Sequence, residues 1–212
     1  VLGLFSLFLF YKILTKLKIK RQLTNLSCLI FAITPLFIYT FSYPNDIFIP
    51  FFLTLLTIHL FLKENKLWYF SILTAILLTL FSLPSTLILL ATLIFLTIYK
   101  KIPKKKITLI SLLTIFSTLS YYISFFLNYD FPKFLNILNL NIFNSFISDF
   151  GALMSFSIFF LLLSILGLVM MNKTHEALPL FITSLLLLVA SYYFPSLRIY
   201  LNILLSIIVA QS

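Results

Sequence analysis

Three charged side chains stand at the edges of long apolar stretches, where they could act on a substrate. Asp46 lies in "FSYPNDIFIP", Asp149 in "FISDFG" and Arg198 in "FPSLRIY". Carboxylates suit a hard divalent cation such as Mg²⁺ or Mn²⁺, and they can also serve as a general base or as a hydrogen-bond acceptor for a substrate. The planar guanidinium of arginine suits bidentate binding of a phosphate or diphosphate. Together these groups could bind a metal ion and a phosphorylated substrate.

Each of these residues also has a simpler interpretation, which the sequence leaves open. Asp46 and Asp149 precede apolar stretches, so either could be the N-cap of a helix. Arg198, at the end of an apolar stretch, could simply place its charge among lipid headgroups. Asp130 in "NYDFPK" fits a turn residue. His59 has no second metal-ligand type nearby, so it fits a packed residue or one that forms a hydrogen bond between helices.

The composition places these residues in a membrane protein. The chain is 62% hydrophobic and 9% charged, with a mean hydropathy of +1.15. A water-soluble domain of 212 residues could not bury that much apolar surface. Apolar runs recur along the chain, which predicts an all-α, polytopic transmembrane bundle. The single cysteine, Cys28, supports neither a disulfide nor a cysteine-based metal site.

Charges, prolines and asparagine clusters divide the chain into about nine apolar spans. Several are shorter than the roughly 20 residues of a perpendicular crossing. We treat residues 1–212 as one transmembrane domain, and expect the sequence to be a fragment that is incomplete at both ends. The approximate spans are 1–15, 23–42, 47–62, 67–82, 85–99, 107–128, 152–171, 177–193 and 199–211.

The loops between these spans alternate in charge. Of the 15 lysines and arginines, 13 fall in one set of loops if Lys12 is counted with its neighbouring loop, and the other two are Lys133 and Arg198. The positive-inside rule places the lysine-rich loops in the cytoplasm, so the three candidate site residues lie on the opposite face. The net charge of +10 then serves orientation and contact with anionic lipids. No aromatic–basic interleaving indicates a nucleic-acid partner. The lysine-rich loops are 16–21, 63–66, 100–106 and 172–176.

The segment 129–151 is the only long loop of the predicted outer face. Its asparagines interrupt leucines, isoleucines and phenylalanines, a mixture too polar to span a membrane and too apolar to float in water. We predict an amphipathic segment that lies in the outer interface. Such a loop could cover a groove where a lipid-linked substrate meets an acceptor, or it could be peripheral and contact no substrate.

Three stretches, in order and on one predicted face, resemble a known family. They are similar to the membrane domain of polyisoprenyl-phosphate-dependent glycosyltransferases of the C-type fold, most closely the catalytic subunit of oligosaccharyltransferase. "SYPND" resembles the motif Ser-Tyr-Asp-Asn-Glu, with Asp46 at the metal-binding Glu and Pro44 in place of Asp. "FISDFG" is similar to Thr-Ile-x-Glu or Ser-Val-Ser-Glu, with Asp149 at the Glu that contacts the acceptor. "YYFPSLRIYLNILLSI" resembles the late helix whose Arg binds the lipid-linked diphosphate, a position that Arg198 fills.

The resemblance implies a membrane glycosyltransferase. It would move a sugar or glycan from a polyprenyl (dolichyl-type) phosphate or diphosphate to a glycan or protein acceptor, on the non-cytoplasmic face. Asp149 would be catalytic, Arg198 would bind the lipid phosphate, and Asp46 with Asp149 would hold Mg²⁺ or Mn²⁺. The family's first outer loop, with its catalytic Asp, would precede residue 1, and its soluble C-terminal domain would follow residue 212.

Two other classes of protein stay open. Prolines at 35, 50 and 179 could mark broken helices, which are typical of transporters. A polytopic transporter or flippase subunit without glycosyl transfer is therefore the alternative. The centres of the predicted spans carry no acid or base apart from His59, which argues against it, because transporters place ionisable residues at mid-membrane. A structural membrane subunit without activity is the third class.

Overall fold

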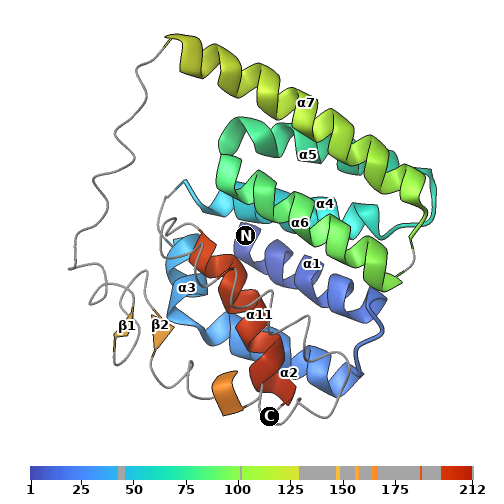
Figure 1. The fold of residues 1–212 in the computed structure, drawn as a ribbon. Helices are drawn as coiled ribbons and strands as arrows, with labels where there is room; N and C mark the ends of the chain where they lie inside the picture. The colour runs from blue at the N-terminus through green and yellow to red at the C-terminus, as the bar shows by residue number, and fades with distance from the viewer. Residues whose placement is uncertain are drawn as a thin grey trace. The chain divides into compact units, whose positions relative to one another are not determined.

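A computed structural model describes residues 1–42, 46–100, 102–128, 147–148, 156–157, 164–166, 187 and 197–211. Apart from one pair of very short strands, the elements in this part of the chain are helices joined by turns (Figure 1). The prediction of an all-α fold is therefore confirmed. The elements are α1 (Leu2–Lys16), α2 (Arg21–Ile33), α3 (Pro35–Ser42), α4 (Phe48–Phe61), the 3₁₀ turn η1 (Lys66–Tyr69), α5 (Phe70–Phe81), α6 (Leu83–Lys100), α7 (Lys104–Asn128), β1 (Ile147–Ser148), β2 (Phe156–Ser157) and α11 (Arg198–Gln211).

The helices follow the predicted apolar ranges closely. Every predicted range up to residue 128 contains a helix, and so does the last range, at 199–211. The ranges 152–171 and 177–193 lie mostly outside the described residues. The prediction of a helical span from residue 152 is wrong at 156–157, where β2 pairs in parallel with β1. Serine and apolar residues alternate around β2, in the sequence Met154-Ser155-Phe156-Ser157-Ile158, although over too few residues to predict a strand.

Fewer helices meet the requirements for crossing a membrane than we predicted. Among the described residues one helix, Lys105–Ile123, is long and apolar enough, or two if the bent pair α2–α3 forms one span. The prediction was about nine. The other apolar helices are shorter, because turns and breaks occupy residues that the apolar runs included. At 14 residues, α4 is about 21 Å long, against a hydrocarbon core of about 30 Å.

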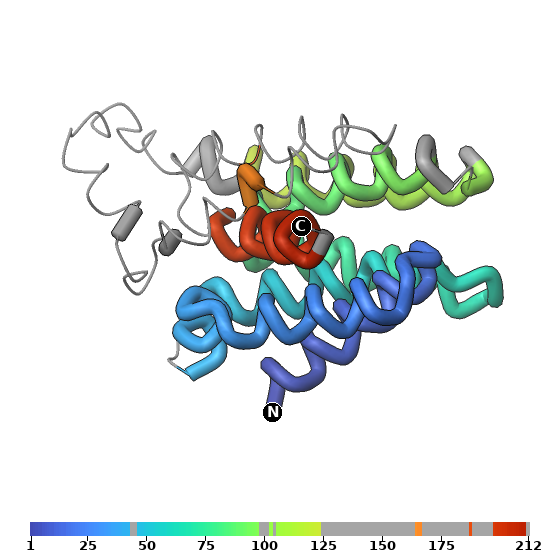
Figure 2. The backbone as a smooth tube through the Cα atoms, turned by 90° about the horizontal axis from the view of Figure 1, so that it is seen from below, coloured from blue at the N-terminus to red at the C-terminus, as the bar shows by residue number. Residues whose placement is uncertain are grey.

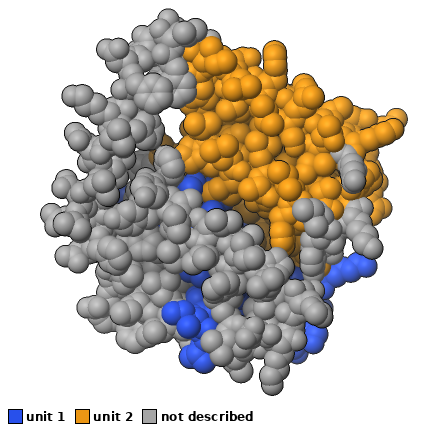
Figure 3. Space-filling model, in the orientation of Figure 1, with its two compact units in different colours: residues 1–7, 18–45, 137–212 blue, residues 8–17, 46–136 orange. Residues whose placement is uncertain are grey.

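The chain divides into two compact units, blue and orange in Figure 3. Unit 1 contains residues 1–7, 18–45 and 137–212, and unit 2 contains residues 8–17 and 46–136. The helix α1 contributes its first part to unit 1 and its second part to unit 2.

Unit 2 is a bundle of antiparallel helices. Helix α5 packs against α4, α6 and α7, and α6 lies beside α7 in both ribbon views (Figures 1 and 2). The C-terminal ends of α1, α4 and α6 and the start of α7 lie together, at the right of Figure 1. The predicted lysine-rich loops 63–66 and 100–106, and Lys16 at the start of the loop 16–21, therefore lie at one end of unit 2. Small hydroxyl side chains join the helices: Thr57 Oγ1 lies 2.8 Å from Thr74 Oγ1, and both residues are buried.

In unit 1, α11 packs against α2 and α3 (Figure 1). The axes of α2 and α3 meet at 62° because the chain breaks at Thr34. Pro35 disfavours helical geometry in the preceding residue, and Thr34 accordingly has an extended ψ of 135°. At Gly3, an added Cβ would lie 3.1 Å from the Cβ of Phe41, so glycine allows the start of α1 to approach α3 closely.

Small polar side chains are buried beside the apolar core, and many large apolar side chains are exposed. Buried positions include many serines and threonines, among them Thr54, Thr57, Thr74 and Thr86. Most of these hydroxyls are satisfied by backbone carbonyls of their own helix, such as that of Thr54 by the carbonyl of Pro50 at 2.8 Å. Large apolar side chains meanwhile point outward. On α7 alone, Leu109, Leu112, Ile115, Phe116, Leu119 and Ile123 are exposed.

Candidate functional site

Arg198 is the candidate site residue with the most defined surroundings. It is the first residue of α11 and is 4% exposed. Its neighbours Leu197, Ile199 and Tyr200 are buried as well. A guanidinium remains charged under nearly all conditions, so this end of α11 carries a buried positive charge. Such a charge interacts more strongly with an anion than a solvated one does, because less water screens it.

Arg198 belongs to a line of buried polar residues along one face of α11. Asn202 and Ser206 follow it at intervals of four residues, which places all three on the same side of the helix. Asn202 Nδ2 donates a hydrogen bond to Thr34 Oγ1 at 2.7 Å, and both residues are buried. The Thr34 hydroxyl in turn donates to the carbonyl of Phe31 at 2.7 Å. A hydrogen bond thus joins the face of α11 that carries Arg198 to Thr34, the residue at the break between α2 and α3.

The hydrogen bond between Asn202 and Thr34 lies where α2 ends and α3 begins. The first backbone N–H groups of a helix have no partner within the helix and form the positive end of its dipole. Thr34 immediately precedes α3, and Arg198 lies one helical turn, about 5.4 Å, before Asn202 along α11. Arg198 is therefore about one helical turn from a polar contact at which the negative end of α2 and the positive end of α3 meet.

Sequence reasoning identified Arg198 but did not identify Thr34 or Asn202. The available signals were an asparagine inside an apolar stretch, four residues after the arginine, and a threonine directly before a proline. Neither signal shows that the two residues meet, because 168 positions separate them.

Asp46 is exposed and lies in the turn directly before α4. The N-cap of α4 is Ile47, and the cap residue makes no side-chain hydrogen bond, so the interpretation of Asp46 as an N-cap is wrong. The carboxylate faces solvent at the end of α4 opposite to Lys63. Within unit 2, Asp46 and the lysine-rich loops are therefore at opposite ends, as the alternation of loop charge predicts.

The structure describes two of the three predicted site residues, and these two belong to different units. Arg198 lies in unit 1 and Asp46 in unit 2, while Asp149 is outside the described residues, as is Asp130. In the described part of the chain no group of three or more His, Cys, Asp or Glu residues could hold a metal ion. The predicted interfacial loop 129–151 also lies outside the described residues, except for Ile147 and Ser148 in β1.

His59 fits the interpretation of a packed residue. Its side-chain Nδ1 is buried and makes no hydrogen bond. Its backbone carbonyl instead accepts a hydrogen bond from Lys16 Nζ at 3.2 Å, which joins α4 to α1. The contact between helices at this position is therefore made by the main chain of His59.

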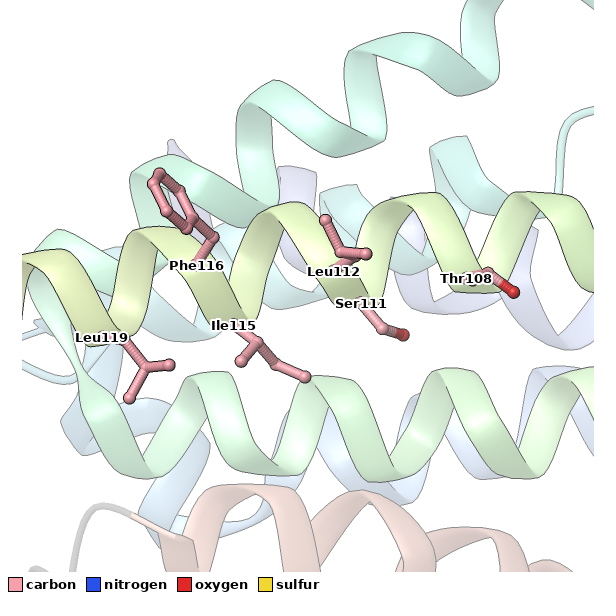
Figure 4. Close-up of a pocket in the computed structure, with 6 residues that line it drawn as sticks. All are labelled: Thr108, Ser111, Leu112, Ile115, Phe116 and Leu119. Atoms are coloured by element: carbon pink, nitrogen blue, oxygen red, sulfur yellow. The ribbon is translucent and has the colours of Figure 1, made fainter.

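A shallow groove runs along α7 (Figure 4). Its lining residues recur every three or four positions and so belong to one face of the helix. None of them is ionisable, so the groove offers apolar contact and no acid–base chemistry. The lining residues are Thr108, Ser111, Leu112, Ile115, Phe116 and Leu119.

Comparisons of the chain with protein families, with curated proteins and with solved structures gave no match.

Proposed function

We propose that this chain is the membrane-embedded part of a glycosyltransferase that uses a lipid-linked sugar. It transfers a sugar or glycan from a polyprenyl phosphate or diphosphate carrier to a glycan or protein acceptor, on the non-cytoplasmic face. The observation that carries the proposal is the burial of Arg198, one helical turn from the hydrogen bond between Asn202 and Thr34.

A polytopic placement in the membrane is part of this proposal. The outward-facing leucines and phenylalanines of α7 would contact acyl chains, whereas water would make their exposure costly. The buried threonines between α4 and α5 are typical of helices that associate in lipid, where small polar residues allow close packing. The separation of Asp46 from the lysine-rich end of unit 2 supports a crossing by α4.

Arg198 is proposed to bind the phosphate of the donor. Its guanidinium can donate two parallel hydrogen bonds to phosphate oxygens. Negative charge grows on the phosphate as the bond to the sugar breaks, so a fixed buried cation stabilises the leaving group more than the bound donor. The polyprenyl tail would remain in the bilayer, beside apolar helices.

Asp46 and Asp149 remain the proposed ligands of a divalent cation. The described residues supply one of these two carboxylates, Asp46, and its exposure suits a hard cation that keeps several waters. A bound Mg²⁺ or Mn²⁺ would supply Lewis-acid neutralisation of phosphate charge. Asp149 is also proposed to hold the acceptor in position for attack on the sugar.

The broken helix favours one second candidate. In transporters, the ends of discontinuous helices bind the substrate near mid-membrane, and positive helix starts point at its anionic groups. The break of 62° between α2 and α3, beside a buried arginine, has these features. The alternative is therefore a transporter or flippase subunit that moves an anionic substrate, with no glycosyl transfer.

Substitution of Arg198 in the full-length protein tests the proposal. We expect Arg198→Gln to lower sugar transfer from a radiolabelled polyprenyl-linked donor by roughly 10- to 100-fold, because one charge-assisted contact contributes about 1.5–3 kcal/mol. Arg198→Lys should retain part of the activity, since lysine keeps the charge but loses the bidentate geometry. Asp46→Asn and Asp149→Asn are expected to lower transfer as well.

Ser206→Ala is the matched control, because Ser206 lies on the same face of α11 and its hydroxyl bonds only the carbonyl of Ile203 in its own helix. It should transfer sugar at the wild-type rate. Normal transfer by correctly folded Arg198→Gln would refute the phosphate assignment. If that variant instead slowed movement of the lipid-linked sugar between leaflets, the transporter alternative would replace the transferase.

A further inference from the structure

We propose that the lysine-rich end of unit 2 binds the headgroups of anionic phospholipids, with Trp68 and Tyr69 at the boundary between headgroups and acyl chains. We call this region the basic surface. The inference rests on the membrane placement in the proposed function and is independent of sugar transfer. The basic surface comprises Lys16, Lys63, Lys66, Lys105 and Lys106.

Two lysines of the basic surface are fixed by the end of α4. Lys16 Nζ donates to the carbonyl of His59 at 3.2 Å, and Lys106 Nζ donates to the carbonyl of Lys63 at 3.1 Å. The carbonyl of His59 belongs to the last turn of α4, whose carbonyls have no partner within the helix and form the negative end of its dipole, and that of Lys63 lies two residues past the helix. The two carbonyls therefore hold cations from α1 and α7 at the same end of the bundle.

The positive charge of this surface is only weakly compensated. Among the described residues at this end of unit 2, Glu64 is the only acid. Burial and repulsion from Lys63 lower the pKa of Lys16 below its ordinary value, and Glu64 raises it by a smaller amount. The side chain of Lys16 thus experiences an excess of positive potential. A surface of this kind attracts anions.

Aromatic and apolar side chains adjoin the lysines. Lys106 Nζ lies 5.4 Å from the centroid of the Trp68 ring, which stacks on Tyr69 at 4.1 Å between centroids. Leu67, Tyr69 and Phe70 are 42%, 55% and 57% exposed. A partner that covers both kinds of side chain must carry negative charge directly beside hydrocarbon.

An anionic phospholipid has this chemistry, because its phosphate lies at the edge of the acyl layer. Tryptophan and tyrosine favour that boundary, and lysines near it gain from the negative surface potential. A nucleic acid or an acidic soluble protein would satisfy the lysines but leave Leu67 and Phe70 uncovered. The geometry therefore favours a lipid.

Trp68 is the only tryptophan of the chain, so its fluorescence reports on this surface alone. The full chain is reconstituted in phosphatidylcholine vesicles that contain either brominated phosphatidylglycerol or brominated phosphatidylcholine at the same mole fraction. Bromine quenches tryptophan at short range. We expect stronger quenching by the brominated phosphatidylglycerol, and a reduction of this preference at high salt, which screens exposed charges.

Two variants with equal loss of charge separate a local site from a general effect of net charge. Lys63→Gln/Lys66→Gln removes two lysines beside Trp68, and we expect the preference for the anionic lipid to fall about fivefold or more. Lys18→Gln/Lys20→Gln removes two lysines that follow Lys16 in the predicted loop 16–21 but do not belong to the basic surface, and should keep the preference. Circular dichroism of both variants checks that their helices are intact.

The outcomes also distinguish the inference from the proposal on which it rests. Equal quenching by the two brominated lipids would overturn the anionic-lipid site but leave the membrane placement in force. An equal loss of preference in both double variants would likewise overturn the site, in favour of net charge. No quenching by either lipid would overturn the membrane placement as well. None of these results depends on transferase activity.

Discussion

Lys16 is a single residue on which several features of unit 2 act together. It follows the predicted span 1–15, donates to the carbonyl of His59 and lies close enough to Lys63 to be repelled. Burial is the larger cause of its lowered pKa, followed by Lys63, whereas Glu64 acts in the opposite direction. The ordinary pKa of a lysine is 10.5. The charge of Lys16 is therefore less favourable in the folded chain than in the unfolded one.

We expect substitutions of the two neighbours to move the pKa of Lys16 in opposite directions. Lys63→Gln should raise it by removing repulsion, and Glu64→Gln should lower it by removing attraction. The measurement is acylation of Lys16 over a range of pH, followed by mass spectrometry. A shift in the same direction for both variants would contradict the placement of these three side chains.

The sign of the pH dependence follows from linkage. Because the folded chain holds this proton less tightly than the unfolded chain, the protonated Lys16 opposes folding. Its unfavourable contribution is present in full below the lowered pKa. It disappears as the pH rises through that pKa towards 10.5, so the free energy of unfolding contributed by this residue increases with pH over that window.

At this scale, sequence reasoning identified residue types but not their partners. Arg198 could be predicted as a candidate because it is the single arginine of the predicted outer face, yet its hydrogen-bonded neighbours Asn202 and Thr34 could not. Asp46 fitted an N-cap by its position before an apolar stretch, but α4 begins one residue further on, with Ile47 as the cap. A local pattern cannot fix a helix boundary to one residue.

At the scale of elements, the break between α2 and α3 is held by one hydrogen bond from α11. We expect Asn202→Ala to lower the free energy of unfolding in detergent by about 1 kcal/mol, because Thr34 Oγ1 loses its donor and the site is buried. Chemical unfolding followed by circular dichroism measures the change.

Ser206→Ala serves here too as the matched control, since its hydroxyl bonds only within α11, and its effect should be smaller. A double-mutant cycle with Thr34→Val isolates the pair. A coupling energy near zero would show that the contact between Asn202 and Thr34 does not stabilise the break.

Element types were largely predictable, because runs of apolar residues of helical length leave few alternatives in a chain of this composition. The breaks were harder. Pro35 does interrupt a helix, but Pro50 does not, since it is the third residue of α4 and lies in the first turn, where a proline needs no partner for its missing N–H. The two strands were missed because each has only two residues, too few for an alternating pattern to stand out.

At the scale of the whole molecule, the alternation of charged loops predicts on which side of the membrane each loop lies. In a Cys28→Ser background, Asp46→Cys and Lys66→Cys place single thiols before and after α4, at exposed positions. We expect a membrane-impermeant maleimide to label Asp46→Cys in intact cells and Lys66→Cys only after permeabilisation. The Cys28→Ser parent should remain unlabelled. Labelling of both positions from one side would contradict a crossing by α4.

The packing of helices against one another was the least predictable feature. Apolar faces that contact lipid and apolar faces that contact other helices have similar composition, so hydrophobic periodicity does not indicate which helices pair. The buried threonines of α4 and α5 give a weak signal, because small polar residues favour interfaces. Helices α2 and α11 carry the same kind of signal in the buried residues Thr24, Ser27, Asn202 and Ser206, but it does not indicate which helices pair.

The contact between α11 and α2 can form only late in synthesis of the chain, after α11 has been made. Asn202 and Thr34 are 168 residues apart, whereas α4 to α7 are consecutive. At roughly 5–20 residues per second, the ribosome needs on the order of 8–34 s to deliver Asn202 after Thr34. The helices α2 and α3 must wait through that interval without their partner, while the α4–α7 bundle can already assemble. Early-acting chaperones and proteases would therefore encounter unit 1 in its unfinished form.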